Sequence, residues 1–438
     1  MEDRGGESRS RPGLITKIPC DQLTTLLASA ARKIPRSGKR QVCFPITNRA
    51  YYGRSQLLIR KLHSHPGIEL ELMLGGSILL DKYSRHIADD IEAGGFTISA
   101  SLFNVIEGGN HVAMAKTACL TALEFTNGLH TIDPDVVVIC GDRFEQLAIA
   151  MAAAYLNKTI AHIEGGDVSG SIDESVRHAI TKLAHIHFVT NADAHRRVLA
   201  MGEDPRYVFN AGSLDVELAS RVDTVITNEI VNRYGVGHTV DVTRPFLMVI
   251  QHPVTTEREN RHHLEATMLA VSSLGLPAIW FWPNPDAGTG EMAETLRHFR
   301  ERHEAATDRM RFITNVPAEE FIAMLKLAAC LVGNSSAGIK ECSYLGTPVV
   351  DIGGRQQGRL TAENVVHVGY ETGAIERAVQ AQIRHGHYVP SNVYYQPDAS
   401  GTIVDVLATI ALYTQKRFHE AIPGSITGDA VTASLRTP

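Results

Sequence analysis

The sequence predicts an α/β protein made of two doubly wound, Rossmann-like domains that face each other across a cleft. Its 438 residues suffice for two domains of roughly 200 residues each. Short apolar runs alternate with helical patterns, which is typical of parallel sheets covered by helices on both faces. A polar stretch with few strand-like runs, near residues 215–245, divides these units into two series. We therefore place the domain boundary there.

Four segments follow along the chain. Residues 1–38 are polar and are predicted to be a disordered leader. Residues 39–220 and residues 221–405 are predicted to form the first and second Rossmann-like domains. Residues 406–438 are predicted to be a C-terminal helix followed by a polar tail.

The composition predicts a globular protein of the cytoplasm without a nucleic-acid or membrane partner. A net charge of -6 does not provide the basic surface that nucleic-acid phosphates require. The chain has no run of about 18 apolar residues, and its N-terminus lacks the apolar core of a signal peptide. The six cysteines have no CxxC spacing, and several lie in apolar runs, as expected for reduced core cysteines.

Three strands of the first series end in polar turns. They are residues 41–47 before Asn48-Arg49-Ala50, Val136–Cys140 before Gly141-Asp142-Arg143, and Thr159–Ile163 before Glu164-Gly165-Gly166. Residues 144–157 are alanine-rich and helical in pattern, so a right-handed crossover puts the last two strand ends on one sheet edge. Ligands bind at the carboxyl ends of strands in such sheets. We expect Asp142 and Glu164 to lie close together there.

Asp173 adds a third carboxylate at the start of the next predicted helix. Ser171 and Glu174 form a capping-box pattern, which makes Ser171 the expected N-cap and leaves Asp167 to the turn. Arg177 lies one turn beyond Asp173 on the same face. Burial and like charges raise carboxyl pKa values, whereas a helix N-terminus favours ionised Asp173, so three carboxylates can divide into acid and base. The plainer alternative is that all three only cap turns or complement the helix dipole.

The histidines of this region do not have the spacing of a metal site. No HExxH or similar motif occurs. We expect packing and hydrogen-bonding roles, and no metal or redox cofactor, for His162, His178, His185, His187 and His195.

The turn after Cys330–Gly333 predicts an anion site in the second domain. Ser335 and Ser336 open a predicted helix, where hydroxyl and backbone N–H groups can bind an anion. The GxxxxGK[ST] spacing of a Walker A loop is missing. Phosphate would repel Glu341 of the same helix, so we expect it to accept hydrogen bonds from ribose hydroxyls. This pattern describes a nucleoside diphosphate site.

Further strands of the second series are predicted at residues 246–250 and 278–282 and at Val349–Ile352. The turns after the first and third of these strands contain arginine or histidine side chains, whose N–H groups could donate to a phosphate or a sugar. The candidates are His252, Arg355 and Arg359, with Arg49 entering from the first domain. Alternatively, the arginines are plain surface charges and the histidine is structural.

An ordered set of short motifs resembles the hydrolysing UDP-N-acetylglucosamine 2-epimerases, which include bacterial enzymes of sialic-acid synthesis. The chain is similar to the epimerase half of the animal bifunctional enzyme, and we expect that half alone. The motifs keep the family's order, which is far more specific than any one of them. They are Gly141-Asp142-Arg143-Phe144, residues 162–173, residues 177–185, Gln251-His252-Pro253, Asn284-Pro285-Asp286-Ala287-Gly288, Gly333-Asn334-Ser335-Ser336, residues 346–349 and Gly354-Arg355-Gln356.

The resemblance implies a glycosyltransferase-B-like fold and a reaction that proceeds through a 2-acetamidoglucal to N-acetylmannosamine, or an analogue, and UDP. By matching motifs, the acid/base residues are Asp142, Glu164 and Asp173, supported by His252 and Arg177. UDP or the rest of the substrate would be held by Arg49, Arg143, Asn284, Ser335, Ser336, Glu341 and Arg355. No metal or cofactor is implied, and a homodimer or homotetramer is suggested.

The chain departs from the family pattern at two positions of the first domain. Tyr51 stands where the family usually has an acidic residue, and Ile78 where it tends to have histidine. The sugar therefore stays open, and a 2,4-diacetamido sugar is an alternative to UDP-N-acetylglucosamine. The sequence also leaves open a non-hydrolysing epimerase, a family that usually has glutamate at the position of Asp173. A glycosyltransferase of the same architecture and an inactive nucleotide-sugar sensor stay open as well.

Overall fold

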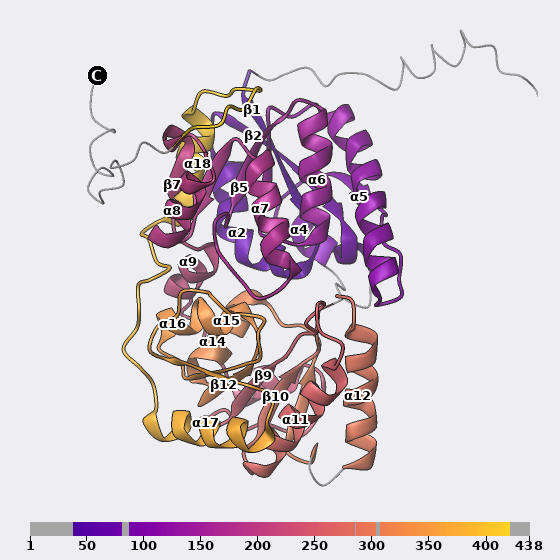
Figure 1. Cartoon of the computed structure of the whole chain (residues 1–438), viewed down its shortest axis with the longest axis vertical. Helices are drawn as coiled ribbons and strands as arrows, with labels where there is room; N and C mark the ends of the chain where they lie inside the picture. The colour runs from indigo at the N-terminus through magenta and orange to yellow at the C-terminus, as the bar shows by residue number, and fades with distance from the viewer. Residues whose placement is uncertain (1–37, 81–86, 285, 304–306, 421–438) are drawn as a thin grey trace, which may run out of the picture.

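The computed structural model describes residues 38–80, 87–284, 286–303 and 307–420. They form two α/β domains, one above the other in Figure 1, each built on a seven-stranded sheet. The predicted fold class, two Rossmann-like domains with helices around parallel sheets, is confirmed.

The first sheet is parallel throughout, in the order β3-β2-β1-β4-β5-β6-β7. The order reverses between β1 and β4, and this reversal creates a crevice at the carboxyl ends of the strands. β4 and β5 are buried along their whole length because they are central and apolar. The strands are β1 (Arg40–Ile46), β2 (Ile68–Gly75), β3 (Ile98–Leu102), β4 (Val136–Cys140), β5 (Thr159–Ile163), β6 (Ile186–Val189) and β7 (Val208–Asn210).

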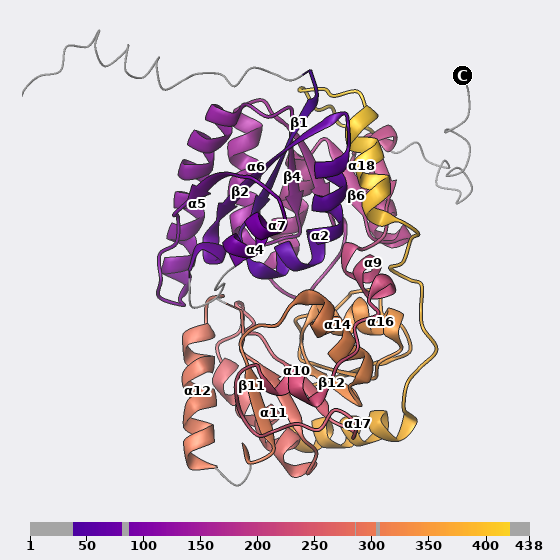
Figure 2. The ribbon, with the colours of Figure 1, turned by 180° about the vertical axis from the view of Figure 1, so that it is seen from behind.

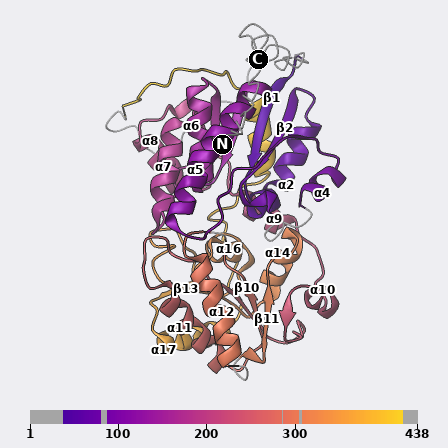
Figure 3. The same cartoon turned by 90° about the vertical axis from the view of Figure 1, so that its right-hand side faces the viewer.

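Helices cover both faces of the first sheet. Figure 3 shows α5, α6, α7 and α8 on one side, and α2 and α4 on the other. Leu58 and Leu62 of α2 enter one core, and Phe125 of α5 enters the other. The helices are α2 (Arg49–Ser64), the 3-10 turn η1 (Gly76–Leu79), α4 (Ile87–Ala93), α5 (His111–Ile132), α6 (Phe144–Tyr155), α7 (Ile172–Leu183), α8 (Ala192–Ala200), η2 (Pro205–Tyr207) and α9 (Leu214–Arg221).

The second sheet has the order β14-β13-β12-β9-β10-β11-β8, and of these strands β8 alone is antiparallel. Its strands are β8 (Val236–Gly237), β9 (Leu247–Ile250), β10 (Ala278–Phe281), β11 (Met310–Ile313), β12 (Cys330–Gly333), β13 (Val349–Ile352) and β14 (Val365–Val368). Its helices are α10 (Asn228–Asn232), α11 (Asn260–Ser273), α12 (Thr289–Arg302), α14 (Ala318–Leu327), α15 (Ser336–Ile339), α16 (Glu341–Leu345) and α17 (Thr372–His385). The order reverses between β9 and β12, which puts a second crevice opposite the first domain.

The last helix, α18 (Ala399–Thr409), returns to the first domain, beside α2 in Figure 2. Its Ile403 and Leu407 are buried in the same core as Leu58. The helix therefore begins before the predicted residue 406, inside the segment assigned to the second domain, because its apolar face is complementary to α2. The boundary between residues 220 and 221 stays a prediction, and residues 1–37 and 421–438 lie outside the described part.

Every strand predicted from the sequence exists, with bounds that agree to within one residue. Further strands, including β2, β3 and β6, were not predicted. Among the described residues, no helix is long and apolar enough to span a bilayer.

Candidate active site

The carboxyl ends of β4 and β5 lie against the second domain. Asp142 follows β4, Glu164 follows β5, and Asp173 lies in the first turn of α7. The N–H group of Gly141 donates to the carbonyl of Ile163 (3.0 Å), which ties the two strand ends together. The structure thus gathers the three carboxylates at the interface, and their roles in acid/base chemistry stay predictions.

Asp142 is surrounded by arginines of both domains. Arg177 of α7 donates from Nη2 to its carboxylate, and Nη2 of Arg359 in the second domain lies 4.0 Å away. Burial opposes ionisation, but Arg177 and Arg359 outweigh it, so the pKa of Asp142 lies well below its usual range. Arg177 is itself buried and also donates to the carbonyl of Asp167 (2.8 Å) and the hydroxyl of Ser169 (3.2 Å). It is therefore a support of Asp142.

Glu164 is held by two cations, one from each domain. Its Oε2 accepts from Arg54 of α2 (3.0 Å) and its Oε1 accepts from Lys340 (2.5 Å). Burial raises the pKa of Glu164, but Arg54 and Lys340 outweigh burial and lower it overall. Its backbone has φ of 74°, a left-handed conformation that is costly for a residue with a Cβ.

Asp173 differs from the other two carboxylates. It accepts from the hydroxyl of Ser171 (3.0 Å) and lies 3.9 Å from Nη2 of Arg355. Burial, followed by the charge of Asp142, raises its pKa. The expected preference of the α7 N-terminus for ionised Asp173 is thus opposed by burial and by the like charge of Asp142, which raise the pKa of this carboxyl overall.

The predicted capping box is also wrong, although Ser171 is the N-cap of α7. The hydroxyl of Ser171 donates to Asp173 and does not cap the helix. Glu174 instead accepts from the N–H group of Ser169 (2.6 Å) and so fixes the preceding turn. Asp167 accepts from Thr190 (3.2 Å) and from Asn191 (3.0 Å), which follow β6, so it links two loops, and its assignment to the turn stays a prediction.

The loop after β4 rests on Tyr51 of α2. The hydroxyl oxygen of Tyr51 accepts from the N–H groups of Asp142 (3.3 Å) and Arg143 (3.2 Å). Tyr51 is 4% exposed, and Ile78 is packed in the first-domain core. Tyr51 and Ile78, which depart from the family pattern, are thus both part of the packed structure of the first domain.

Asn334 organises the loops of the second domain. Its Oδ1 accepts from the N–H group of His252 (2.7 Å), and its side-chain amide donates to the carbonyl of His252 (2.9 Å). Its own carbonyl accepts from Arg355 (3.0 Å) and from Gln356 (2.8 Å). The structure therefore brings His252 and Arg355 together beside Asn334, as the sequence pattern suggested.

His252 has a defined tautomer. Its Nδ1 accepts from the N–H group of Asn284 (3.2 Å), so the proton of the neutral ring is on Nε2. Burial, followed by the charge of Arg355, lowers the pKa of His252 to about 3. At neutral pH the ring is a neutral donor, in agreement with the ring N–H expected from its position.

The predicted helix of the anion loop is two short helices, α15 and α16, that meet at Lys340. Ser335 is the N-cap of α15, since its hydroxyl accepts from the N–H group of Ala337 (3.3 Å). Glu341 opens α16, is buried, and its Oε2 has no hydrogen-bond partner in the described part of the chain. Burial, followed by the charge of Asp215, raises the pKa of Glu341 to about 8.

Arg143 and Arg49 both reach across the interface. Arg143 donates from Nη1 to Asp286 of the second domain (2.6 Å) and from Nε to Glu145 (3.1 Å). Arg49 donates to the carbonyl of Thr314, and burial lowers its pKa to about 10. Both guanidinium groups thus have protein partners, so binding a ligand there would require exchange of those partners.

Sequence reasoning missed two residues that contact a candidate acid/base group and a third that contacts both of them. Arg54 and Lys340 bind Glu164, and Asp215 lies within 3.5 Å of both cations. Arg54 follows Arg49 by five positions in α2, and Lys340 is adjacent to Glu341, so proximity to known candidates was a usable signal. Asp215 had no such signal, because it lies at the start of the polar stretch in which we placed the domain boundary.

His162, His185 and His187 have the hydrogen-bonding roles that were expected, whereas Nδ1 of His178 is buried without a partner in the described part of the chain. His162 contacts the carbonyl of Gly141 (3.0 Å), and His187 contacts Glu203 (3.1 Å). In the described ranges, no group of three or more histidine, cysteine or acidic side chains is placed to hold a metal ion.

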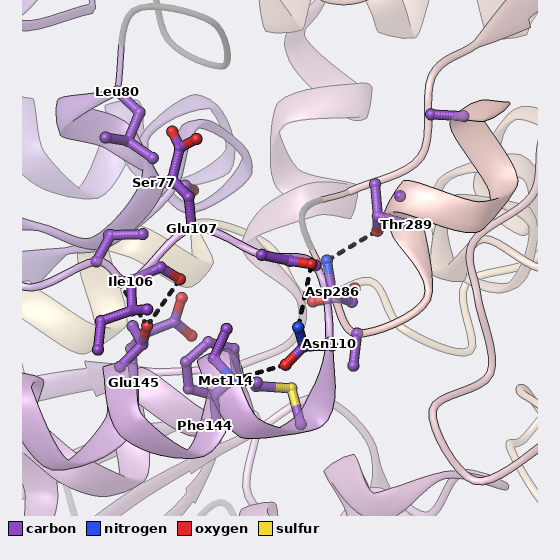
Figure 4. Close-up of a pocket in the computed structure, with 18 of the residues that line it drawn as sticks. Ser77, Leu80, Ile106, Glu107, Asn110, Met114, Phe144, Glu145, Asp286 and Thr289 are labelled. Atoms are coloured by element: carbon purple, nitrogen blue, oxygen red, sulfur yellow. Dashed lines mark hydrogen bonds between the residues drawn. The ribbon is translucent and has the colours of Figure 1, made fainter.

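A cavity of about 460 Å³ opens between the domains beside this site (Figure 4). Asn110, Phe144 and Glu145 of the first domain face Asp286 and Thr289 of the second across it. Glu145 and Asp286, the two carboxylates that bind Arg143, both lie in its wall. The rest of the lining is Ser77, Leu80, Val105, Ile106, Glu107, Gly108, Gly109, Ala113, Met114, Thr117, Ala287, Gly290, Ala293 and Arg297.

Comparison with known proteins places this site in a family. The sequence pattern of the family described as UDP-N-acetylglucosamine 2-epimerase matches residues 60–408. The chain belongs to the UDP-N-acetylglucosamine 2-epimerase family. The match covers the carboxylates of the first domain and the anion loop of the second.

Two curated relatives of this epimerase are similar over most of their length. A protein of Legionella pneumophila named UDP-N,N'-diacetylbacillosamine 2-epimerase (hydrolyzing) is 30% identical over 377 residues, covering 86% of this chain and 97% of its own. A protein of Neisseria meningitidis named UDP-N-acetylglucosamine 2-epimerase is 31% identical over 388 residues, covering 87% and 98%.

The solved structures confirm the fold. A UDP-GlcNAc 2-epimerase from Neisseria meningitidis, crystallised with UDP-GlcNAc, superposes with a TM-score of 0.67 at 16% identity, over 84% of this chain and 99% of that one. The epimerase thus has the glycosyltransferase-B-like arrangement that the sequence predicted.

Proposed function

We propose that this epimerase is hydrolysing. It would convert UDP-N-acetylglucosamine, or a related UDP-2-acetamido sugar, and water into N-acetylmannosamine, or its analogue, and UDP. The observation that carries the proposal is the division of three carboxylates at one interface: the pKa values of Asp142 and Glu164 are lowered and that of Asp173 is raised. The name of the Legionella relative specifies hydrolysis, and that of the Neisseria relative does not.

The division suits a reaction that needs both an acceptor and a donor of protons. In the first step an ionised carboxylate, Asp142 or Glu164, removes the C2 proton as the C1–oxygen bond to UDP breaks, which gives the 2-acetamidoglucal. In the second step water adds its oxygen to C1 and gives a proton to whichever of Asp142 and Glu164 is still ionised. C2 receives a proton on the opposite face, for which Asp173, with its raised pKa, is the proposed donor. A C2 proton that is not next to a carbonyl is only weakly acidic, so stabilisation of the departing UDP must supply much of the rate.

The second-domain loops are suited to the departing UDP. Arg355 and the Nε2–H of His252 provide a charged and a neutral donor beside Ser335 and Ser336. Glu341, with its raised pKa, carries a proton near neutral pH and can both donate to and accept from a ribose or base. This refines the expectation that Glu341 acts only as an acceptor.

The cavity supports a neutral sugar with apolar substituents. Leu80, Ile106, Met114 and Phe144 give it apolar walls. Its acidic side chains outnumber its arginine, so a second phosphate or carboxylate would be disfavoured there. A UDP-2,4-diacetamido sugar is therefore a second candidate substrate, in line with the name of the Legionella relative.

We also propose a cytoplasmic homodimer or homotetramer. The five described cysteines are unpaired, and four of them are buried, which is consistent with a reducing compartment. Light scattering with size-exclusion chromatography would give the oligomeric state directly.

One experiment separates the hydrolysing reaction from the competing functions. The protein is incubated with UDP-N-acetylglucosamine, or with its 2,4-diacetamido analogue, in deuterated water, and the products are followed by NMR. The free 2-epimeric sugar with deuterium at C2, together with UDP, is the expected result. An intact UDP-sugar epimer would instead identify a non-hydrolysing epimerase. No turnover of either substrate without an acceptor would favour a transferase or a sensor.

A further inference from the structure

Four charged side chains form a buried cluster across the domain interface. They are Arg54 of α2, Glu164 after β5, Asp215 of α9 and Lys340 of the second domain, and we call them the interdomain ion cluster. Lys340 lies 2.5 Å from Glu164 and 3.5 Å from Asp215, and Arg54 lies 3.0 Å and 3.4 Å from the same two carboxylates. Two cations and two anions thus compensate each other, and Lys340 is the one member from the second domain.

Lys340 occupies a special place in the anion loop. It is the break between α15 and α16, so Ser335 and Ser336 precede it and Glu341 follows it directly. Its side chain is 2% exposed, and its ammonium group faces the carboxylates of the first domain. A movement of this loop upon nucleotide binding therefore moves the ammonium group relative to Glu164.

Glu164 has little freedom to follow such a movement. Its backbone is left-handed, and its N–H group donates to the carbonyl of Phe188 (2.9 Å) in the neighbouring strand β6. The position of its carboxylate thus depends on the two cations that hold it. Removing one partner of a buried ion pair leaves the remaining charge uncompensated, which disfavours the ionised form.

We propose that Lys340 is a positioning residue that keeps Glu164 ionised and holds its carboxylate in place. Binding of a nucleotide to the anion loop would then change the contact between Lys340 and Glu164. The role in catalysis rests on the proposed function. The electrostatic part does not, because it concerns only contacts within the protein.

The surroundings of Glu164 favour this role over direct phosphate binding by Lys340. The ammonium group is already engaged by two carboxylates, so a phosphate would have to displace them. The titratable groups that act on Glu164 or on its two cations belong to both domains. They are Tyr51, Arg54, Cys140, Asp142, Asp215, Lys340, Glu341, Arg359 and Tyr394. Arg54 and Lys340 are the two cations that contact its carboxylate directly.

The test compares Lys340→Met with Lys340→Arg, and uses Lys326→Met on the exposed side of α14 as a matched control. Lys340→Met should lower kcat by about tenfold or more, change UDP affinity by calorimetry much less than kcat, and move the acid limb of the pH profile up by about one unit. Lys340→Arg should restore most of kcat, and Lys326→Met should match the wild type.

A spectroscopic readout does not depend on turnover. The side-chain carboxyl of Glu164 is followed by carbon-13 NMR in protein labelled at glutamate, with its signal assigned by its absence in Glu164→Gln. The signal should titrate at higher pH in Lys340→Met, and in the wild type UDP alone should shift it. The wild-type measurement remains decisive if Lys340→Met does not fold.

Three results would overturn the inference. In the first, the Glu164 signal titrates in Lys340→Met as it does in the wild type. In the second, Lys340→Met loses UDP affinity while the titration of Glu164 is unchanged. In the third, the wild-type Glu164 signal does not respond to UDP. Absence of turnover in the wild type would instead refute the proposed function, while the titration still decides the role of Lys340.

Discussion

Asp142, Glu164 and Asp173 have the same chemistry but different surroundings. Arg177 and Arg359 surround Asp142, and Arg54 and Lys340 surround Glu164, whereas the nearest cation to Asp173 is Arg355 at 3.9 Å. Two carboxylates are therefore kept ionised, and the third retains its proton to higher pH. At this scale the cations, supplied by both domains, determine the charge of each carboxylate.

The replacement Asp142→Asn tests this division. The amide keeps the size of the side chain but can neither accept a proton nor balance Arg177. We expect kcat to fall by about 10²–10⁴-fold, while calorimetry still detects UDP binding. Asp223→Asn, at an exposed position, should be as active as the wild type. A near-normal rate in Asp142→Asn would show that another group carries out the proton transfer.

Glu341→Gln should change how stability depends on pH. The pKa of Glu341 is raised to about 8 in the folded protein, so the unfolded chain loses this proton at lower pH than the native state does. The wild type therefore loses stability as the pH rises from about 5 to 8, whereas glutamine loses none from this source. Between about pH 5 and about pH 8, the melting temperature should therefore change differently in Glu341→Gln than in the wild type. The exposed control Glu301→Gln should follow the wild type, and a parallel course for both variants would contradict the assignment.

At the scale of elements, the first turn of α2 supports the loop that carries Asp142. The hydroxyl of Tyr51 accepts from two backbone N–H groups of that loop, and its ring lies under Arg54 (4.6 Å to the ring centre). Helix α2 therefore contributes to the site through packing as well as through Arg54. A family acidic residue at this position would instead put a charge next to Asp142.

The replacement Tyr51→Phe should weaken this support. Two backbone donors lose their shared acceptor in a buried place, which costs about 1–3 kcal/mol in unfolding free energy. Activity should fall because the loop bearing Asp142 is less well fixed. Tyr155→Phe, whose side chain is 86% exposed, is the control for loss of a tyrosine hydroxyl. Chemical denaturation and steady-state kinetics measure both effects, and equal stability of the two variants would refute the supporting role.

Some elements could be predicted from the sequence and others could not. Strands such as Val136–Cys140 were predictable because a continuous apolar run ends in a polar turn, and this also located Asp142 and Glu164. β3, with its alternating half-buried and exposed residues, lacks such a run. The capping box failed because two other local contacts compete with it: Ser171 donates to Asp173, and Glu174 accepts from Ser169. The ion pair of Lys340 instead depends on a contact far apart in the chain, as Lys340 is 176 positions from Glu164. Local spacing carries no information about such contacts.

At the scale of the whole molecule, the chain links the two domains more than once. After completing the second sheet it crosses back, and α18 packs on α2 in the first domain (Figures 1 and 2). Arg40 of β1 donates to the carbonyl of Leu407, which ties α18 to the first strand (2.5 Å). The first domain is therefore not complete until the last described helix has been added.

This architecture predicts a distant effect of Leu407→Ala. Leu407 is fully buried against the core of the first domain, so its truncation should cost about 2–5 kcal/mol in unfolding free energy. Hydrogen exchange should rise in β1 and α2, more than 300 positions away in sequence, and stay unchanged in α11 and α17 of the second domain. Val389→Ala, on the exposed segment that crosses between the domains, should have neither effect because Val389 is 89% exposed. Faster exchange confined to the second domain would mean that α18 belongs energetically to the sheet it follows in sequence, and not to the one it covers.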